Sequence, residues 1–200
     1  MTIKAQIWDL EGVLMLTDEV DLSMKVAKIL DASYEEVREI FFSEMNDFVD
    51  LGEVTQDQFN EYLLDTLGMS HDKKPLLEKF VMEDFYVDED LLQTISSMRG
   101  RYRVGLLSNF SDELRYRIDN VWKLGEVFDE IIISCEVGLV KPDPRLFNLM
   151  LERLGVKADE TVFVDDRIKN IEGAKKLGFH TVFYTEKEQA LSELDRILQG

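Results

Sequence analysis

The chain has 200 residues, 45% of them apolar, which suits one globular domain or a domain with a modest insertion. Its 41 acidic and 23 basic residues give a formal net charge of −18, which argues against nucleic acid or an anionic membrane as the main partner. Because an acidic protein repels anions, a phosphate site here would need positive charge of its own, from a metal or a lysine.

Cysteine usage and the N-terminus indicate the compartment. Cys135 is the only cysteine, so no internal disulfide is available, and this side chain is expected to be a small core residue. The N-terminus lacks a basic segment before a long apolar run, and no stretch approaches the roughly 18 apolar residues of a membrane span. The sequence therefore predicts a cytoplasmic protein with no membrane partner, and it does not fix the oligomeric state.

The first predicted strand lies near the N-terminus and ends at Asp9. Ile3, Ala5 and Ile7 alternate with polar or aromatic neighbours, as in a strand. Gly12 then turns the chain. Open parallel sheets bind ligands at the carboxyl ends of their strands, so an acid at this place suggests a site. Ordinary turns contain the same residue types, and this stretch alone leaves both interpretations open.

After residue 16, about seventy residues show apolar side chains at helical spacing. Two capping boxes mark helix starts, one at Ser33 with Glu36 and one at Thr55 with Gln58. No strand is evident in this block, so we expect a helical insertion that folds against a separate core. Four helices are predicted, over residues 21–30, 33–48, 55–67 and 75–85.

From Asp88 onward predicted helices and strands alternate, which indicates an α/β fold with a parallel sheet. Ser111 is expected to cap one of the helices, and Thr185 with Glu188 the last one. The predicted strands cover residues 102–107, 131–133, 161–164 and 181–183. The predicted helices cover residues 91–98, 111–121, 146–154 and 171–177, followed by the C-terminal helix.

Polar side chains follow four of the predicted strands. Together at one edge of a parallel sheet they would form a cavity with carboxylates for a divalent cation, a hydroxyl and amides for phosphate oxygens, and an ammonium group. Such a set is suited to moving a phosphoryl group. In chain order the residues are Asp9 and Glu11, Ser108 and Asn109, Lys141, and Asp165 and Asp166.

These motifs resemble those of the haloacid dehalogenase (HAD) superfamily of phosphatases and phosphotransferases. Asp9-Leu10-Glu11-Gly12-Val13 is similar to the family's first motif, Asp-x-Asp-Gly-[Thr/Val], with one departure at Glu11. The other matching features, in the family's order and spacing over essentially the whole chain, are a strand that ends at Ser108, the loop Lys141-Pro142-Asp143-Pro144, and a strand that ends at Asp165-Asp166.

The resemblance implies a Rossmann-like α/β core, a parallel sheet of about five strands with helices on both faces, plus an inserted four-helix cap. The core domain would comprise residues 1–15 and 86–200, and the cap domain residues 16–85. It also implies a Mg²⁺ cofactor, held by Asp9, the main-chain carbonyl of Glu11, and Asp166. Asp165 and Asn170 would support this metal site through water or hydrogen bonds.

The remaining roles implied by the resemblance concern the phosphoryl group. Asp9 would attack phosphorus to form an aspartyl phosphate, which splits one difficult displacement into two easier ones. The hydroxyl of Ser108 and the amide of Asn109 would hold the phosphoryl oxygens. Lys141 would offset the negative charge on those oxygens and on Asp9.

Glu11 occupies the position at which the family has an Asp that protonates the leaving oxygen and then activates water. Its carboxyl group lies one methylene further from the backbone, and proton transfer requires a heavy-atom distance of roughly 2.6 to 3.2 Å. Three outcomes remain open: an enzyme adapted to Glu11, an enzyme slowed in proton transfer, or a fold retained without turnover. The metal should survive, because its ligand at this position is a main-chain carbonyl.

The predicted function is Mg²⁺-dependent hydrolysis of a small phosphorylated metabolite, with a sugar phosphate as the family default. The alternatives are a phosphoglucomutase-like phosphotransferase and a HAD-fold binding protein whose catalysis is impaired at Glu11. Dehalogenation is disfavoured, because the family members that dehalogenate lack the paired acids of Asp165-Asp166.

Overall fold

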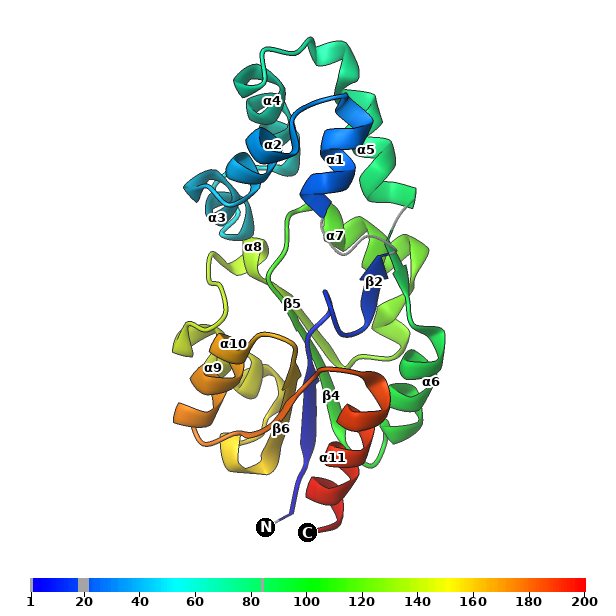
Figure 1. Ribbon diagram of the computed structural model, residues 1–200. Helices are drawn as coiled ribbons and strands as arrows, with labels where there is room; N and C mark the ends of the chain where they lie inside the picture. The colour runs from blue at the N-terminus through cyan, green and yellow to red at the C-terminus, as the bar shows by residue number, and fades with distance from the viewer. Residues whose placement is uncertain (1, 18–21, 84) are drawn as a thin grey trace.

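A five-stranded parallel sheet lies at the centre of the core (Figure 1). The structure, a computed structural model, describes residues 2–17, 22–83 and 85–200. Neighbouring strands pair in parallel in the order β5-β4-β1-β6-β7, so the predicted parallel sheet is confirmed. The strands are β1 (Ala5–Trp8), β4 (Arg103–Ser108), β5 (Glu130–Ile133), β6 (Thr161–Asp165) and β7 (His180–Phe183).

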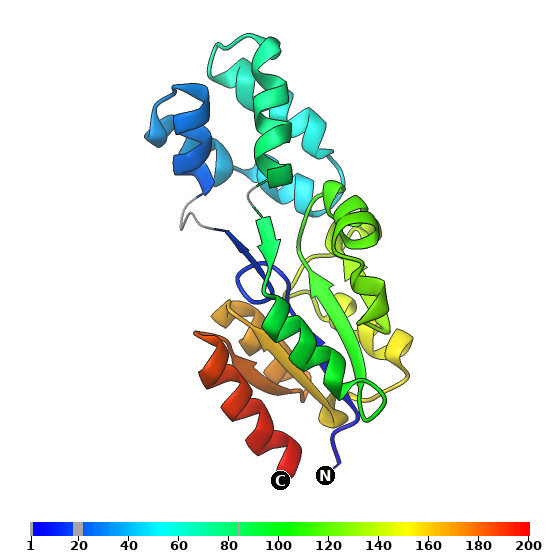
Figure 2. The ribbon, with the colours of Figure 1, turned by 90° about the vertical axis from the view of Figure 1, so that its right-hand side faces the viewer.

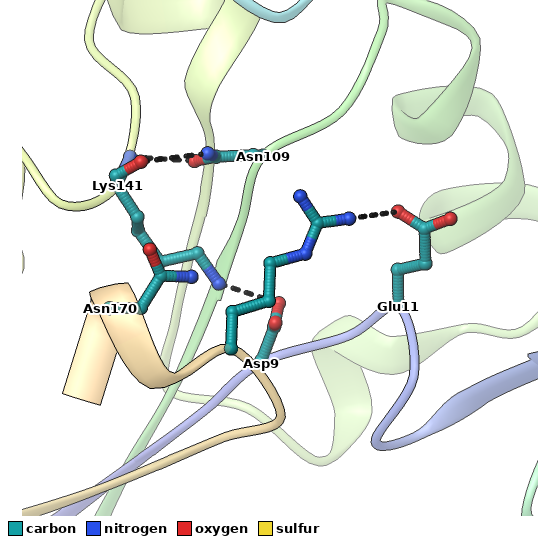
Figure 3. A pocket seen from close by; sticks show the side chains of 6 residues that line it. Asp9, Glu11, Asn109, Lys141 and Asn170 are labelled. Carbon is teal, nitrogen blue, oxygen red and sulfur yellow. Dashed lines mark hydrogen bonds and ion pairs between the residues drawn. The ribbon is translucent and has the colours of Figure 1, made fainter. Parts of the chain in front are cut away.

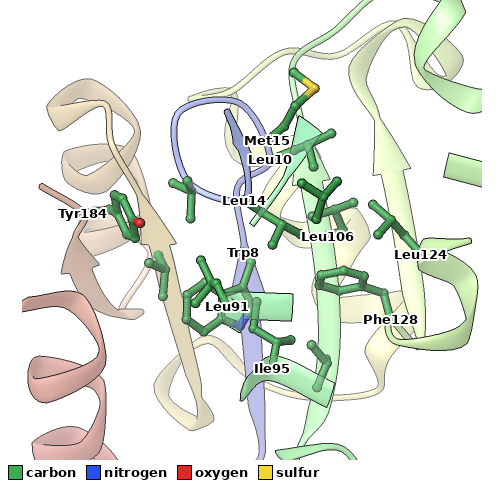
Figure 4. Packing of buried hydrophobic residues seen from close by; sticks show 14 of the residues in the cluster. Trp8, Leu10, Leu14, Met15, Leu91, Ile95, Leu106, Leu124, Phe128 and Tyr184 are labelled. Atoms are coloured by element: carbon green, nitrogen blue, oxygen red, sulfur yellow. The ribbon is translucent and has the colours of Figure 1, made fainter. Parts of the chain in front are cut away.

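Helices cover both faces of this sheet, as the predicted fold class requires (Figure 1, Figure 2). Because side chains alternate along a strand, β1 sends Trp8 to one face and Ile7 to the other. Trp8 packs among apolar residues of α6 and α11 (Figure 4), and Ile7 among those of α9 and α10. These helices are α6 (Glu89–Met98), α9 (Pro144–Leu154), α10 (Ile168–Lys176) and α11 (Lys187–Gln199).

The predicted helical insertion lies beyond the carboxyl ends of the strands and has an apolar cluster of its own (Figure 1). Its first helix was expected to begin at Asp21, which falls outside the described residues. No helix in the described ranges is both long and apolar enough to cross a membrane. The helices of the insertion are α1 (Leu22–Leu30), α2 (Tyr34–Phe41), α3 (Glu44–Asp50), α4 (Gln56–Thr66) and α5 (Lys74–Glu83), with a short 3₁₀ helix (His71–Lys73) before α5.

The described residues of the insertion thus form five α-helices, where the sequence predicts four. The helix expected over residues 33–48 ends at Phe41, and Ser43 starts a second helix from an extended conformation. The Ser43 hydroxyl donates a 2.6 Å hydrogen bond to the carbonyl of Ile40, so it takes an acceptor from the end of α2. Apolar spacing continues across this break, which is why periodicity alone does not reveal it.

Two short strands connect the core and the insertion, and the expectation of a block without strands was wrong. Met15–Thr17 (β2) and Phe85–Val87 (β3) pair in antiparallel fashion. Phe85, expected at the end of a helix, therefore belongs to a strand. Three residues are too few to show a period of two, so the tertiary pairing decides the local structure here.

Capping predictions had mixed outcomes. The Thr55 capping box is present with both of its hydrogen bonds. Asp112, rather than Ser111, is the N-cap of the short helix α7 (Glu113–Tyr116), and Glu186, rather than Thr185, precedes α11. Both starts lie one residue later than the Ser or Thr spacing indicates.

The insertion docks on the core where α3 meets α8 (Ser134–Val137), a short helix that directly follows β5. The Ser134 hydroxyl donates a 2.6 Å hydrogen bond to the Asp50 carbonyl and accepts a 3.0 Å bond from the Phe110 amide. Gly52 follows α3 with φ of +74°, and a Cβ atom there would lie 2.2 Å from the Cys135 carbonyl oxygen. The contact between insertion and core therefore depends on a glycine at position 52.

Gly52→Ala is expected to lower the free energy of unfolding by about 2 to 4 kcal/mol, because left-handed strain adds to a clash with main-chain atoms. Gly68→Ala is the matched control. Its φ is +64°, but no atom lies within 4 Å of the added Cβ, so only the strain of about 1 to 2 kcal/mol applies. Urea denaturation of both variants measures the difference, and equal losses would contradict the docking contact.

Candidate functional site

The polar residues that follow the strands meet at the carboxyl edge of the sheet. Asp9 follows β1, which lies between β4 and β6 in the sheet. Ser108 ends β4 and Asp165 ends β6, so these residues flank Asp9 on both sides. From β1 the chain runs to β4 and β5 on one side, and the strands that follow, β6 and β7, lie on the other side of β1. Such a reversal of strand order opens a crevice at the strand ends.

Lys141 bridges two acids at the bottom of this crevice. Its Nζ lies 2.7 Å from Asp9 Oδ1 (Figure 3) and 2.8 Å from Asp165 Oδ2. All three side chains are buried. Burial lowers the pKa of Lys141, but the two carboxylates outweigh it and leave the pKa above its ordinary value. The ammonium group therefore stays charged, as a buried cation does when it is paired.

Burial raises the pKa of Asp9 to about 8; Lys141 opposes this rise, and the Asp165 charge adds to it. The main-chain amide of Leu10 donates a 2.7 Å hydrogen bond to Asp9 Oδ1. The carboxyl group is thus held in one orientation at the end of β1. A divalent cation beside it would lower the pKa and favour the carboxylate.

Of the described acids in this crevice, Asp165 has the most hydrogen-bond donors around it. Besides Lys141, the Arg167 amide donates a 2.8 Å bond and Asn170 Nδ2 lies 3.0 Å from both carboxylate oxygens. Asn170 comes from α10, so the sequence-predicted supporting residue does lie against this acid. With its oxygens so occupied, Asp165 is suited to orient Lys141 rather than to bind an added group.

Asp166 differs from its neighbour because its Oδ1 is buried without a hydrogen-bond partner. Gly12 makes room for it: φ is +80°, and a Cβ atom there would lie 2.5 Å from Asp166 Oδ2. Carboxylate oxygens of Asp9, Asp165 and Asp166 lie within 4.8 Å of one another. A cluster of hard oxygen donors with an unpartnered oxygen fits Mg²⁺.

Ser108 and Asn109, at the carboxyl end of β4, differ in their hydrogen bonds. Ser108 Oγ is buried and has no hydrogen-bond partner, so its hydroxyl is available to a bound group. The Asn109 side chain accepts a 2.8 Å bond from the Lys141 amide and donates a 3.1 Å bond to its carbonyl (Figure 3). The side chain of Asn109 therefore fixes the loop that carries Lys141, a role that the sequence analysis did not include.

Glu11 and Lys141 lie on opposite sides of Asp9 in the view of Figure 3. The Glu11 carboxylate forms an ion pair with Arg167, with 3.8 Å between Oε2 and Nη2. Burial raises the pKa of Glu11, and Arg167 opposes this rise. Sequence reasoning missed Arg167, although it directly follows Asp165-Asp166, because a lone arginine before a helix usually lies in solvent.

A larger cavity of about 1020 Å³ opens from this crevice toward the insertion. Glu11, Lys141 and Arg167 line it from the core. Apolar and polar residues of α2, α3 and α4 line it from the insertion, among them Phe41, Asp50, Phe59, Asn60 and Leu63. The insertion therefore supplies part of the cavity wall.

Asp50, in the wall of this cavity, has a pKa raised to about 6 by burial and by the Glu11 charge. Because its folded-state pKa exceeds the ordinary value, Asp50 should contribute a loss of stability as the pH rises from about 4 to 6. Asp50→Asn is expected to remove this contribution, which amounts to at most about 3 kcal/mol. Urea unfolding at several pH values measures it, with the exposed Glu39→Gln as control. Equal pH profiles for the wild type and Asp50→Asn would contradict the shift.

Comparison with known proteins identifies the family. The model of the haloacid dehalogenase-like hydrolase family matches residues 3–178. D-ribitol-5-phosphate phosphatase of Bacteroides thetaiotaomicron is 30% identical over 145 residues, which cover 65% of this chain and 66% of that protein. (S)-2-haloacid dehalogenase 4A of Burkholderia cepacia is 29% identical over 141 residues, or 69% of this chain and 60% of that protein. Some relatives are longer: the chain spans 7% of Acyl-CoA dehydrogenase family member 10 of Mus musculus and 39% of bifunctional epoxide hydrolase 2 of Sus scrofa.

Solved structures share the fold over nearly the whole chain. A HAD family enzyme from Bacteroides thetaiotaomicron in complex with magnesium has a TM-score of 0.82 at 24% identity, covering 96% of this chain and 99% of that one. A HAD phosphatase from Thermococcus onnurineus has a TM-score of 0.66 at 25% identity and covers 99% of both chains. The predicted resemblance is thereby confirmed, and the chain belongs to the haloacid dehalogenase-like hydrolase family of enzymes.

Proposed function

We propose that this protein is a Mg²⁺-dependent phosphomonoester hydrolase that acts through an aspartyl phosphate. The observation that carries the proposal is the buried group of Asp9, Lys141 and Asp165, with the unpartnered oxygens of Asp166 and Ser108 beside it. It combines a nucleophile, a fixed cation and unused oxygens for a metal and a phosphoryl group. The phosphatase among the relatives supports the same reaction class.

The reaction would use two displacements at phosphorus. An Asp9 oxygen forms a bond to phosphorus while the ester oxygen leaves and takes a proton from the Glu11 carboxyl group. Water then attacks the same phosphorus, Glu11 accepts its proton, and the bond to Asp9 breaks. Lys141, the Ser108 hydroxyl and the main-chain amide of Asn109 would stabilise the charge on the phosphoryl oxygens.

Asp9, Asp166 and the main-chain carbonyl of Glu11 are the groups proposed to hold Mg²⁺. When bound, the cation supplies positive charge between two anions, the Asp9 carboxylate and the phosphate, that otherwise repel. Asp165 keeps Lys141 and the start of α10 in place. Asp9 itself stays oriented through the hydrogen bond from the Leu10 amide.

The substrate is proposed to be a small phosphorylated metabolite, such as a sugar phosphate. Residues 1–15 and 86–200 would act as the catalytic core domain and residues 16–85 as a cap domain over it. A cavity of about 1020 Å³ is ample for a phosphorylated sugar, since ligand pockets measure roughly 300 to 1000 Å³. The cytoplasm, where such metabolites occur, is the proposed location.

Hydrolysis of an aryl phosphate with Mg²⁺, with a chelator, and with Asp9→Asn tests the proposal. Turnover that needs both the metal and Asp9 is the expected result. Transfer of the phosphoryl group to an added sugar phosphate, in place of release of inorganic phosphate, would favour a phosphotransferase. Mg²⁺ binding without turnover on aryl phosphates and on a panel of metabolites would favour a binding protein impaired at Glu11.

A further inference from the structure

Of the two cations that line the small pocket beside Asp9, Arg167 is paired less tightly than Lys141. Its side chain lines both the small pocket beside Asp9 and Lys141 and the larger cavity under the insertion. The ion pair with Glu11 is long, at 3.8 Å, and the Arg167 side chain is 50% exposed. A pair of this length and exposure is weak, so another anion is able to replace Glu11 as the partner of the guanidinium group.

Lys141 does not have this freedom. Carboxylate oxygens at 2.7 and 2.8 Å occupy its ammonium group on two sides. Lys141 and a divalent cation would together supply three positive charges, against four negative charges when all the carboxyl groups around them are ionised. A phosphate dianion that enters this site therefore needs more positive charge. The four carboxylates are those of Asp9, Glu11, Asp165 and Asp166.

We infer that Arg167 is a second phosphate-binding cation, which Glu11 holds beside the site until a phosphate dianion replaces its carboxylate. The inference rests on the phosphatase function proposed above. The planar guanidinium group matches phosphate oxygens with two parallel hydrogen bonds. The Arg167 amide bonds Asp165 Oδ1 at 2.8 Å, so the root of the side chain is anchored at the site. When phosphate replaces Glu11 as the partner of Arg167, the Glu11 carboxyl group is also released from its ion pair.

Calorimetric titration of inorganic phosphate in the presence of Mg²⁺ tests the inference on the full chain. Arg167→Met keeps the aliphatic stem and is expected to weaken phosphate binding about 10-fold or more, as for a lost charge-assisted hydrogen bond. Arg167→Lys, which keeps the charge without the paired donors, should lose less. Lys169→Met is the matched control, because Lys169 lies two residues further along, in α10, and lines the larger cavity. The phosphate affinity of this variant should stay within about 3-fold of the wild type.

Glu11→Gln provides the second arm, since it removes the anion that competes for Arg167. This variant is expected to bind phosphate about 3-fold or more tightly, as for a weak ion pair, and the gain should vanish in the double variant with Arg167→Met. An equal gain in phosphate affinity with and without Arg167→Met would mean that Glu11 merely repels phosphate. That result would overturn the proposed competition between Glu11 and phosphate for Arg167.

Two further results separate this inference from the proposed function. Phosphate binding by Arg167→Met at wild-type strength would overturn the inference and leave the phosphatase proposal standing. A wild-type protein that binds Mg²⁺ but neither binds phosphate nor hydrolyses its esters would overturn both. Thermal unfolding and Mg²⁺ affinity of Arg167→Met, both expected to be unchanged, show that the variant retains its site.

Discussion

Replacing Asp9 by Asn is expected to reduce hydrolysis of an aryl phosphate by at least about 10³-fold, because an amide cannot attack phosphorus. The fold should persist. The side-chain oxygen of Asn is still able to accept hydrogen bonds from Lys141 Nζ and from the Leu10 amide, both of which lie 2.7 Å from Asp9 Oδ1. Because burial opposes the Asp9 charge, the melting temperature should stay equal or rise. Steady-state kinetics and thermal unfolding measure both effects.

Asp65→Asn is a matched control for this experiment. Asp65 is an exposed acid of the insertion, and it pairs with His71 at 2.8 Å. Its replacement changes the net charge by the same amount and should leave turnover within about 2-fold of the wild type. Wild-type turnover in Asp9→Asn would contradict a role for Asp9 as nucleophile and would point to a different reaction path.

The central sheet was predictable because its strands carry strong local signals. β4 and β6 are buried along most of their length and read as apolar runs, and each ends at a polar residue, Ser108 or Asp165. A parallel sheet brings such ends to one edge whatever the details of the loops. Asp9, Ser108, Lys141 and Asp165 therefore meet as expected, although nothing in their spacing shows that Lys141 bridges two of the acids.

Features that depend on tertiary contacts or on a single local hydrogen bond were not predictable. β2 and β3 are three-residue strands that form only against each other. α2 and α3 separate because one hydroxyl, that of Ser43, bonds a helix carbonyl. Arg167 acquires its place from the turn after β6, where it faces Glu11 from another motif. In each case the partner is distant in sequence or the signal is a single atom, and periodicity reports neither.

Glu11→Gln separates the two proton transfers that we assign to Glu11. A nitrophenolate leaves phosphorus without needing a proton, whereas the water that attacks the aspartyl phosphate needs a base. We therefore expect a burst of about one equivalent of nitrophenol, followed by steady turnover reduced about 10² to 10⁴-fold, with Mg²⁺ affinity unchanged. Stopped-flow absorbance measures the burst and the rate that follows it.

Glu11→Asp completes this test, because it returns the shorter acid of the family to this position. If the backbone is adapted to place the longer Glu11 side chain correctly, the Glu11→Asp variant should turn over more slowly than the wild type. Misplacement of a catalytic group by about 1 Å costs on the order of 10²-fold in rate. A steep gain in turnover would instead identify the wild type as an enzyme slowed by its longer acid. Full turnover in Glu11→Gln would mean that Glu11 takes part in neither proton transfer. Loss of the burst in Glu11→Gln would place the defect in the attack by Asp9 on phosphorus. The ion pair between Glu11 and Arg167 would then be the contact to examine.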